Sequence, residues 1–373
     1  MKYYIIAGEA SGDLHGSGLI RELRLVDPEA TIRCWGGDLM QAEGATLVKH
    51  YRELAFMGFA EVVMNLRTIF RNIDFCKKDI AEFKPDALIF IDYPGFNMRI
   101  ARWARKAGIQ THFYISPQIW AWKENRIKDI KRDIDFMYVI LPFELDYYQN
   151  KHQYRVDFVG HPLIDAISRR PMPDAQTFRL ENNLDQRPVI ALLPGSRKQE
   201  ISKMLTEMLA VANKFPDHQF VVAGAPGQEP EFYDKFLGGS DVKLLRNKTY
   251  DLLSISTAAL VTSGTATLET ALFKVPQTVL YKGSWASYQI AKRVISLKYI
   301  SLVNLIMDKP VVTELIQNDC NPENISSELS RLLDPSARSK MLHDYDELEK
   351  MLGGRGAARK TENLIYSRIV KNH

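Results

Sequence analysis

The sequence predicts an α/β protein with two doubly wound domains, because short apolar runs alternate with helical patterns twice along the chain. In the first half the predicted strands are residues 3–7, 31–35, 87–91, 111–115 and 136–140. In the second half they are residues 189–193, 219–223, 242–245, 258–262 and 277–281. Such continuously apolar runs are typical of strands that are buried on both faces of a parallel sheet.

Helical patterns connect the predicted strands, as in residues 13–25 and 98–106. Residues 168–188 are rich in arginine, proline and asparagine and contain no strand pattern, so we place the domain boundary there. The predicted parts are residues 1–168, residues 169–340 and C-terminal helices 341–373, which pack back on the first domain or on a partner chain. Two such domains present the carboxyl ends of their strands to a shared cleft, where ligands bind.

Composition excludes several classes of protein. The 373 residues are 46% apolar and 25% charged, which excludes a disordered chain, and the net charge of +4 does not indicate a nucleic-acid binder. The three cysteines, Cys34, Cys76 and Cys320, form no C-x-x-C pair, so neither a zinc site nor a disulfide framework is expected. The N-terminal apolar run is too short for a signal peptide, and no run reaches the ~18 residues of a membrane span. We therefore expect a cytoplasmic protein, free or resting on a membrane surface.

Two strand–turn–helix junctions in the second half are typical of phosphate binding. Residues 189–193 lead into Gly195, Ser196 and Arg197, where a helix N-terminus offers free N–H groups and arginine offers a forked cation. The second junction follows residues 258–262 and contains Ser263, Gly264, Thr265, Ala266 and Glu269. Its small residues permit a close approach to the backbone, and Glu269 could accept hydrogen bonds from ribose hydroxyls. The alternative is that both are plain turns, in which Arg197 is a surface residue and Glu269 only complements the helix dipole. Neither loop is a P-loop, because no G-x-x-x-x-G-K-[ST] is present.

In the first half, an acid ends the strand at residues 87–91. Asp92 at this position suits a general base, and an acid that caps the following turn is the alternative. The loop at residues 8–13 contains Glu9, Ser11 and Asp13 and could cradle a substrate; a tight turn with Asp13 as a helix N-cap is equally compatible.

Two further segments suggest surface binding. Residues 120–132 place Trp120 and Trp122 before a basic helix that could face anionic lipid, a substrate phosphate or only solvent. Residues 56–71 carry an apolar stripe at helical spacing, which is either a core helix or a helix that touches a membrane. The stripe and its flanking arginine comprise Phe59, Val62, Val63, Leu66, Arg67, Ile69 and Phe70.

The sequence offers little sign of a metal or of a covalent nucleophile. Two D-x-D strings, at residues 133–135 and 344–346, do not follow a strand as metal-binding strings of glycosyltransferases do, and we interpret both as chance. No histidine cluster has metal-ligand spacing, and no G-x-S-x-G is present.

Taken in order, eight motifs closely resemble those of the lipid-A-disaccharide synthase family of bacterial inverting glycosyltransferases. They are GEASGD (8–13), IDYPGFN (91–97), SPQIWAW (116–122), LPFE (141–144), VGHPL (159–163), LPGSR (193–197), SGTATLE (263–269) and SLVNL (301–305). The resemblance implies a GT-B fold, with an acceptor- and membrane-facing first domain and a UDP-donor-binding second domain. It further implies UDP-2,3-diacylglucosamine as donor and 2,3-diacylglucosamine 1-phosphate as acceptor. The products would be a β-1,6-linked disaccharide 1-phosphate and UDP, formed without metal or other cofactor at the cytoplasmic face of the inner membrane.

By the same resemblance, Asp92 is the base for the acceptor 6-hydroxyl and Arg197 stabilises the leaving diphosphate. Ser196 and the N–H groups of residues 264–266 assist, Glu269 holds the ribose, and Asn304 lies near the nucleotide. Glu9, Ser11 and Asp13 line the acceptor side, and the stripe around Arg67 docks on the membrane. The family often has a second acid where this chain has Gly95, so Asp92 would act alone.

Two other interpretations stay open on the sequence alone. One is a different GT-B enzyme, such as a UDP-sugar 2-epimerase, and the other is a non-catalytic nucleotide-sugar or lipid-binding module. The acyl-chain length and the oligomeric state, a homo-oligomer included, are not predicted.

Overall fold

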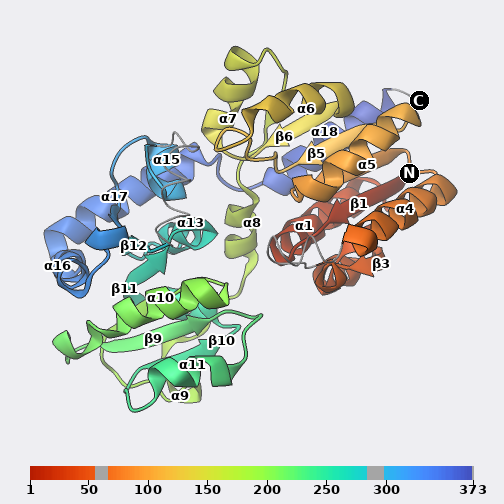
Figure 1. The fold of residues 1–373 in the computed structure, drawn as a ribbon. Coiled ribbons are helices and arrows are strands. Elements are labelled where there is room, and N and C mark those ends of the chain that lie inside the picture. The colour runs from red at the N-terminus through yellow and green to blue at the C-terminus, as the bar shows by residue number, and fades with distance from the viewer. Residues whose placement is uncertain (55–65, 284–297, 372–373) are drawn as a thin grey trace. The chain divides into compact units, whose positions relative to one another are not determined.

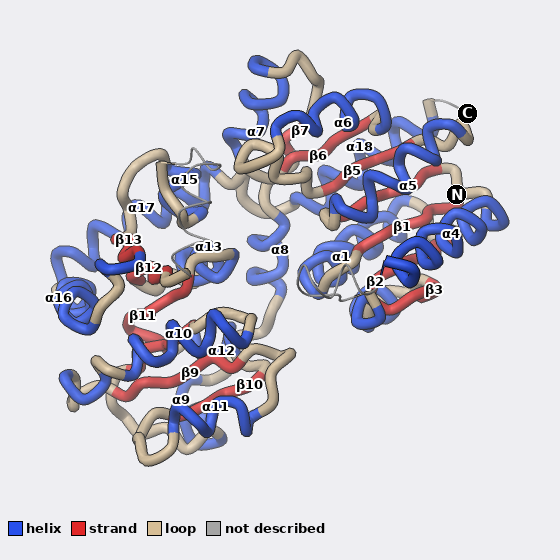
Figure 2. Tube along the Cα trace, in the orientation of Figure 1, coloured by secondary structure: helices blue, strands red, loops and turns tan. Residues whose placement is uncertain are grey.

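In the computed structural model, residues 1–54, 66–283 and 298–371 are described, and they form two compact units. The first unit comprises residues 1–169 and 352–373, and the second comprises residues 170–351. Each unit has its own parallel sheet with helices on both faces (Figures 1 and 2).

The first unit contains a seven-stranded parallel sheet in the order β3-β2-β1-β4-β5-β6-β7. Its strands are β1 (Lys2–Ala7), β2 (Thr31–Gly36), β3 (Thr46–His50), β4 (Ala87–Ile91), β5 (Thr111–Tyr114), β6 (Phe136–Val139) and β7 (Asp157–Phe158). The strand order reverses between β1 and β4, so the loops that follow these two strands emerge side by side at the carboxyl edge of the sheet. The structure therefore brings the predicted loop at 8–13 next to Asp92.

Helices cover both faces of this sheet. They are α1 (Ala10–Val26), α2 (Asp38–Ala42), α4 (Leu66–Phe83), α5 (Pro94–Lys106), α6 (Ile127–Asp133), α7 (Pro142–Asp146), α8 (Pro162–Arg169) and α18 (Ala357–Val370). The Asp165 carboxylate in α8 accepts hydrogen bonds from the N–H groups of Gly356 (2.6 Å) and Ala358 (3.3 Å), where α18 begins. These bonds, and the packing of α18 on α1, attach the end of the chain to the first unit.

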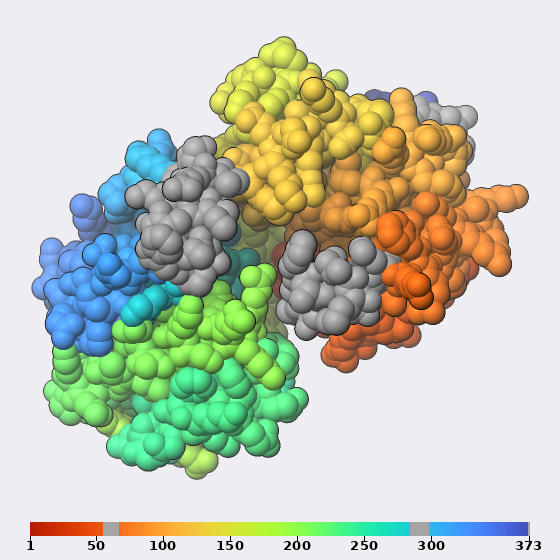
Figure 3. All heavy atoms as spheres, in the orientation of Figure 1, coloured from red at the N-terminus to blue at the C-terminus, as the bar shows by residue number. Residues whose placement is uncertain are grey.

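The second unit contains a six-stranded parallel sheet in the order β10-β9-β8-β11-β12-β13. Its strands are β8 (Val189–Leu193), β9 (Gln219–Gly224), β10 (Lys243–Arg246), β11 (Ser256–Thr262), β12 (Gln277–Tyr281) and β13 (Thr313–Ile316). Its helices include α9 (Ala175–Glu181), α10 (Lys198–Leu209), α11 (Pro230–Leu237), α12 (Thr249–Ser254), α13 (Thr265–Leu272), α15 (Leu302–Met307), α16 (Pro322–Leu333) and α17 (Pro335–Met351). In the space-filling view the green and blue parts of this unit form one continuous body (Figure 3). The strand order reverses between β8 and β11, which places the two predicted phosphate loops side by side.

All ten predicted strands are present, and the described residues contain three further strands that were not predicted. The additional strands β3, β7 and β13 lie at sheet edges, where short and partly polar segments give no continuous apolar run. Helix α1 begins at Ala10 rather than at the predicted Asp13.

Helix α17 crosses the boundary that we placed at residue 341. The whole helix, up to its last residue Met351, belongs to the second unit. Tyr345 of this helix is buried, and its hydroxyl accepts a hydrogen bond from the Gln277 side chain (3.3 Å). Lys274 also forms ion pairs with Asp346 and Glu349 of this helix. The chain joins the first unit only from Leu352 onward.

Candidate active site

Asp92 directly follows β4 and lies in a strained turn. Asp92 and Tyr93 have φ angles of +45° and +48°, a left-handed conformation that costs non-glycine residues energy and that persists only where the surroundings enforce it. Asn97, in the first turn of α5 and fully buried, enforces it here: its side-chain amide donates to the Asp92 carbonyl at 2.7 Å. The same amide lies within 3.5 Å of the carbonyls of Ile6 and Ile91, so it ties together the ends of the two central strands.

Gly8 allows the loop after β1 to approach this turn. A Cβ atom at position 8 would lie 2.3 Å from the Tyr93 ring, so no larger residue fits. The next residue, Glu9, is exposed and precedes α1. The loop therefore places a second carboxylate near Asp92.

The pKa of the Asp92 carboxyl is raised to about 6. Burial is the largest cause, and the negative charge of Glu9 raises the pKa further, whereas the Tyr93 N–H lowers it. A carboxylate with this pKa is ionised at neutral pH and binds a proton more strongly than an ordinary aspartate. These are the properties of a general base.

The other two residues that we predicted on the acceptor side differ in their surroundings. Ser11 is exposed in the first turn of α1. Asp13 is buried, and its carboxylate accepts hydrogen bonds from the N–H groups of Gly37 (2.8 Å), Leu39 (3.2 Å) and Met40 (3.0 Å). Asp13 thus caps α2, a helix different from the one that contains it.

The loop after β8 has the geometry of an anion-binding turn. Gly195 has a φ of +102°, and a Cβ atom there would lie 2.2 Å from the Glu200 carboxylate. That carboxylate accepts from the Ser196 N–H (3.0 Å) and orders the start of α10. Arg197 is exposed, and among the described residues its guanidinium has no hydrogen-bond or ion-pair partner. A free arginine at a helix N-terminus can bind a phosphate.

The loop after β11 lies beside it. The Ser263 hydroxyl donates to the Ile300 carbonyl (2.8 Å), while Gly264 and Thr265 are exposed and Ala266 is half-buried. Glu269, one turn into α13, accepts a hydrogen bond from the Tyr250 hydroxyl (2.6 Å), and burial raises the pKa of its carboxyl.

Asn304 is buried, and its side chain binds other groups of the second unit rather than facing solvent. Its amide donates to the Val312 carbonyl (2.8 Å) and to Glu314 (3.0 Å), and its carbonyl accepts from the Val312 N–H (2.9 Å). Glu314 also accepts from the N–H groups of Ile300 (3.0 Å) and Ser301 (2.9 Å). These two side chains therefore fix residues 300–304, and Ser263 bonds to that segment.

The predicted membrane stripe falls only partly on described residues. Phe59, Val62 and Val63 lie outside them, as does the side chain of Leu66. In α4, Ile69 packs against the core, Arg67 is exposed, and Phe70 is 54% exposed. No helix among the described residues is long and apolar enough to cross a membrane.

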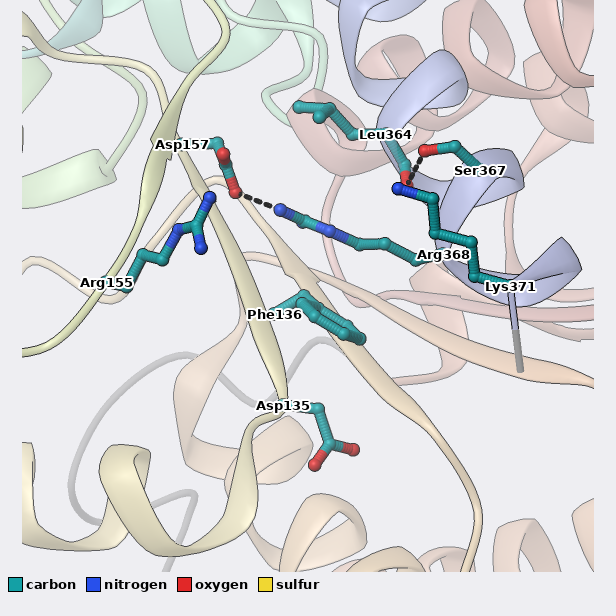
Figure 4. A pocket seen from close by; sticks show the side chains of 8 residues that line it. All are labelled: Asp135, Phe136, Arg155, Asp157, Leu364, Ser367, Arg368 and Lys371. Carbon is teal, nitrogen blue, oxygen red and sulfur yellow. Dashed lines mark hydrogen bonds and ion pairs between the residues drawn. The ribbon is translucent and has the colours of Figure 1, made fainter.

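The first unit also has a pocket of about 390 Å³, at the opposite edge of its sheet from Asp92 (Figure 4). It lies where β6 and β7 begin, and α18 forms its other wall. Arg368 lies over the Phe136 ring (4.3 Å) and pairs with Asp157 (2.6 Å), so these residues hold α18 against the sheet.

Acids of both D-x-D strings bind groups of the protein itself. Asp135 accepts from Thr111 and pairs with Arg105, and Asp344 pairs with Lys309. No group of three or more possible metal ligands occurs within residues 1–54, 66–283 and 298–371.

Comparison with known proteins identifies the family. The model of the family described as "Lipid-A-disaccharide synthetase" matches residues 3–367. The lipid-A-disaccharide synthases of Syntrophus aciditrophicus and Trichlorobacter lovleyi are 38% and 37% identical, and each match covers 99% of this chain and at least 97% of the relative. The chain belongs to the lipid-A-disaccharide synthase family. It is a glycosyltransferase of lipid A biosynthesis.

Comparison with solved structures shows that this chain has a GT-B fold. A UDP-GlcNAc 2-epimerase from Neisseria meningitidis matches 100% of both chains with a TM-score of 0.67 and 14% identity. The kitacinnamycin glycosyltransferase matches 98% of both chains with a TM-score of 0.63 and 14% identity. At this identity the likeness shows the fold alone, so it gives the epimerase interpretation no support.

Sequence reasoning missed several residues that shape the candidate site. Asn97 and Glu144 belong to the motifs at residues 91–97 and 141–144. The motif spacing does not show that both side chains are buried and form several hydrogen bonds. Glu314 lies in the unpredicted edge strand β13. Gly8 was quoted only as part of a turn, although its closeness to Tyr93 is what brings the loop up to Asp92.

Proposed function

We propose that this enzyme transfers a 2,3-diacylglucosamine unit from its UDP derivative to the 6-hydroxyl of 2,3-diacylglucosamine 1-phosphate. Family membership supports substrates that are lipid A precursors. The exact donor and acceptor rest on the motif resemblance, together with the chemistry that the two sheet edges offer.

In this proposal Asp92 is the general base. The observation that carries it is the position of Asp92 at the topological switch point of the first sheet, in a turn whose backbone carbonyl is bound by Asn97. The raised pKa of its carboxyl fits this role. Asp92 would take the proton of the acceptor hydroxyl while the oxygen attacks the anomeric carbon. Glu9 and Ser11 would line the acceptor side, whereas Asp13 would act indirectly by fixing α2.

The second unit would bind the nucleotide. Arg197 and the N–H groups of Ser196 and of residues 264–266 would stabilise the charge that develops on the leaving UDP. Glu269 would accept from ribose hydroxyls with the oxygen that does not bind Tyr250. Asn304 would support the nucleotide loop through residues 300–304. Because these donors would suffice, the proposed reaction is independent of metal ions. It is inverting, because the acceptor oxygen would displace UDP from the anomeric carbon in one step with Asp92 as the base.

We further propose peripheral association with the cytoplasmic face of the inner membrane. Diacylated substrates leave a bilayer reluctantly, at ~0.8 kcal/mol for each buried CH₂ group. The exposed Phe70, with the Arg99 guanidinium over its ring at 5.6 Å, supports contact between α4 and a lipid surface.

The test is UDP release by the purified protein in detergent with EDTA, given UDP-2,3-diacylglucosamine with and without the acceptor. We expect release only when the acceptor is present, together with a new disaccharide in the mass spectrum. Release without acceptor would indicate hydrolysis of the donor. No release by a folded protein that still binds UDP would favour the epimerase or the binding-module interpretation. Loss of activity with EDTA that returns on adding Mg²⁺ would contradict metal independence.

A further inference from the structure

The segment between β5 and α6 presents an aromatic ring with two cations on it. Trp122 is 49% exposed, although tryptophan is usually largely buried. The Lys123 ammonium lies 4.2 Å from the centre of the Trp122 ring, and the Arg126 guanidinium lies 5.8 Å from it. The exposed part of the ring is a platform on which a sugar can stack, and the cations that lie over the ring supply positive charge next to it.

The acids of this segment do not neutralise the two cations. Glu124 pairs instead with Lys151 (2.6 Å) and His152 (3.0 Å). Within the part of the chain that the structure describes, no carboxylate pairs with Lys123 or Arg126. Their positive charge is therefore available to an anionic ligand.

A buried carboxylate holds the base of the segment in place. Glu144 is 1% exposed and accepts from the Ser116 hydroxyl and from the Trp120 indole N–H (3.1 Å). It also accepts from the N–H of Leu141 (2.9 Å) after β6, so it joins the loops that follow two neighbouring strands. The Tyr148 hydroxyl adds a bond to the Pro117 carbonyl (3.0 Å). A segment anchored in this way presents Trp122 with little loss of freedom on binding.

The segment begins beside the proposed base. The Asp92 N–H donates to the carbonyl of Tyr114 (3.2 Å), which is the last residue of β5. The segment thus leaves the carboxyl edge of the sheet from the strand next to Asp92. It belongs to the same unit as the base and starts at the same edge.

We propose that Trp122, Lys123 and Arg126 form a binding site for a phosphorylated sugar, with the sugar on the Trp122 ring and the phosphate on the two cations. Arginine binds phosphate through its forked N–H donors, and lysine adds a compact charge. This inference rests on the proposed function, in which the acceptor is a sugar with a phosphate monoester.

The experiment compares two charge-matched double variants. Lys123→Gln/Arg126→Gln removes the two cations on Trp122, and Lys128→Gln/Lys131→Gln removes two exposed cations of the adjacent α6. Each is assayed with the acceptor and with the same diacylglucosamine lacking the 1-phosphate. We expect the first variant to raise KM for the phosphorylated acceptor at least about tenfold, which corresponds to one lost charge-assisted hydrogen bond. The control variant and the acceptor without phosphate should change less than threefold.

Any of three results would overturn the site. An equal loss in both variants, or a loss that also affects the acceptor without phosphate, would mean that a general surface charge matters. Retained KM with lost binding to phosphatidylglycerol vesicles would assign the cations to a lipid surface.

A binding measurement separates failure of this site from failure of the proposed function. Glucosamine 1-phosphate is titrated into the full chain while tryptophan fluorescence is recorded, with glucosamine and inorganic phosphate as comparisons. The site predicts a saturable change with glucosamine 1-phosphate that Lys123→Gln/Arg126→Gln abolishes and Lys128→Gln/Lys131→Gln retains. Absence of that change in the wild type would refute the site even if acceptor-dependent UDP release occurs. The change without such release would refute only the proposed reaction.

Discussion

The pH dependence of catalysis tests the proposed base most directly. The pKa of Asp92 is raised to about 6, and the charged form is the one that can accept a proton. Above pH 6 the carboxylate predominates and kcat/KM should reach a plateau. Below pH 6 the protonated form predominates and kcat/KM should fall tenfold per pH unit. At pH 5 about a tenth of the enzyme would remain in the active form.

Changing Glu9 to Gln should move this profile toward acid. Glu9 contributes to the raised pKa through its negative charge, and its removal lowers the proton affinity of Asp92. Burial is the larger cause and stays, so the midpoint should fall below about 6 without reaching the ordinary value of 3.8. At pH 5 the variant would then retain a larger fraction of its plateau activity than the wild type does.

The assay is initial-rate UDP release at subsaturating acceptor between pH 4.5 and 8, after unfolding controls at each pH. Glu29→Gln is the matched control, because it makes the same charge change just before β2, at the opposite edge of the sheet. A midpoint that is unchanged in Glu9→Gln, or that moves upward, would refute the coupling. A profile without an acidic limb near pH 6 would refute Asp92 as the base.

Four other outcomes are expected. Asp92→Asn should abolish turnover while UDP binding, measured calorimetrically, survives. Arg197→Ala should lower kcat about 10²–10³-fold, as loss of a charge-stabilising donor does, and a change under threefold would count against its role. Asn97→Ala should destabilise the fold by roughly 1–3 kcal/mol in urea unfolding, because buried carbonyls lose their donor. Phe70→Ser should weaken sedimentation with anionic vesicles without lowering the melting temperature, since this ring is exposed.

The sequence was most informative where one physical signal dominates. Central strands such as β4 and β8 are apolar at every position and fully buried, so their runs were predicted within a residue or two. Edge strands lack that signal. β3, with the sequence TLVKH, has only two apolar residues and no fully buried position, and β7 has only two residues. Their pairing depends on a neighbouring strand that the local sequence does not contain.

The candidate site shows the same division. Asp92 and Arg197 could be predicted because Asp92 directly follows an apolar strand and Arg197 lies in the short turn after another. Ligands bind at the carboxyl ends of such strands. Asp13 and Asn304 had the right residue type and motif position, yet their side chains bind backbone groups from residues 8 to 27 positions away. Hydrogen bonds between distant segments leave no trace in local spacing, so a framework residue and a ligand-binding residue look alike in sequence.

The proposed reaction would require charges of opposite sign in the two units. The pKa of Asp92 is set by burial, by the charge of Glu9 and by the Tyr93 N–H. No cation of the described residues contributes to it. An arginine against Asp92 would lower its pKa and weaken it as a base. In the proposed reaction the leaving diphosphate has the opposite need. Arg197, whose guanidinium has no partner among the described residues, lies in the other unit. Separate sheets therefore let one edge keep a carboxylate of high proton affinity while the other keeps its cation free. The proposed phosphate site obeys the same constraint, because Lys123 and Arg126 leave the pKa of Asp92 raised.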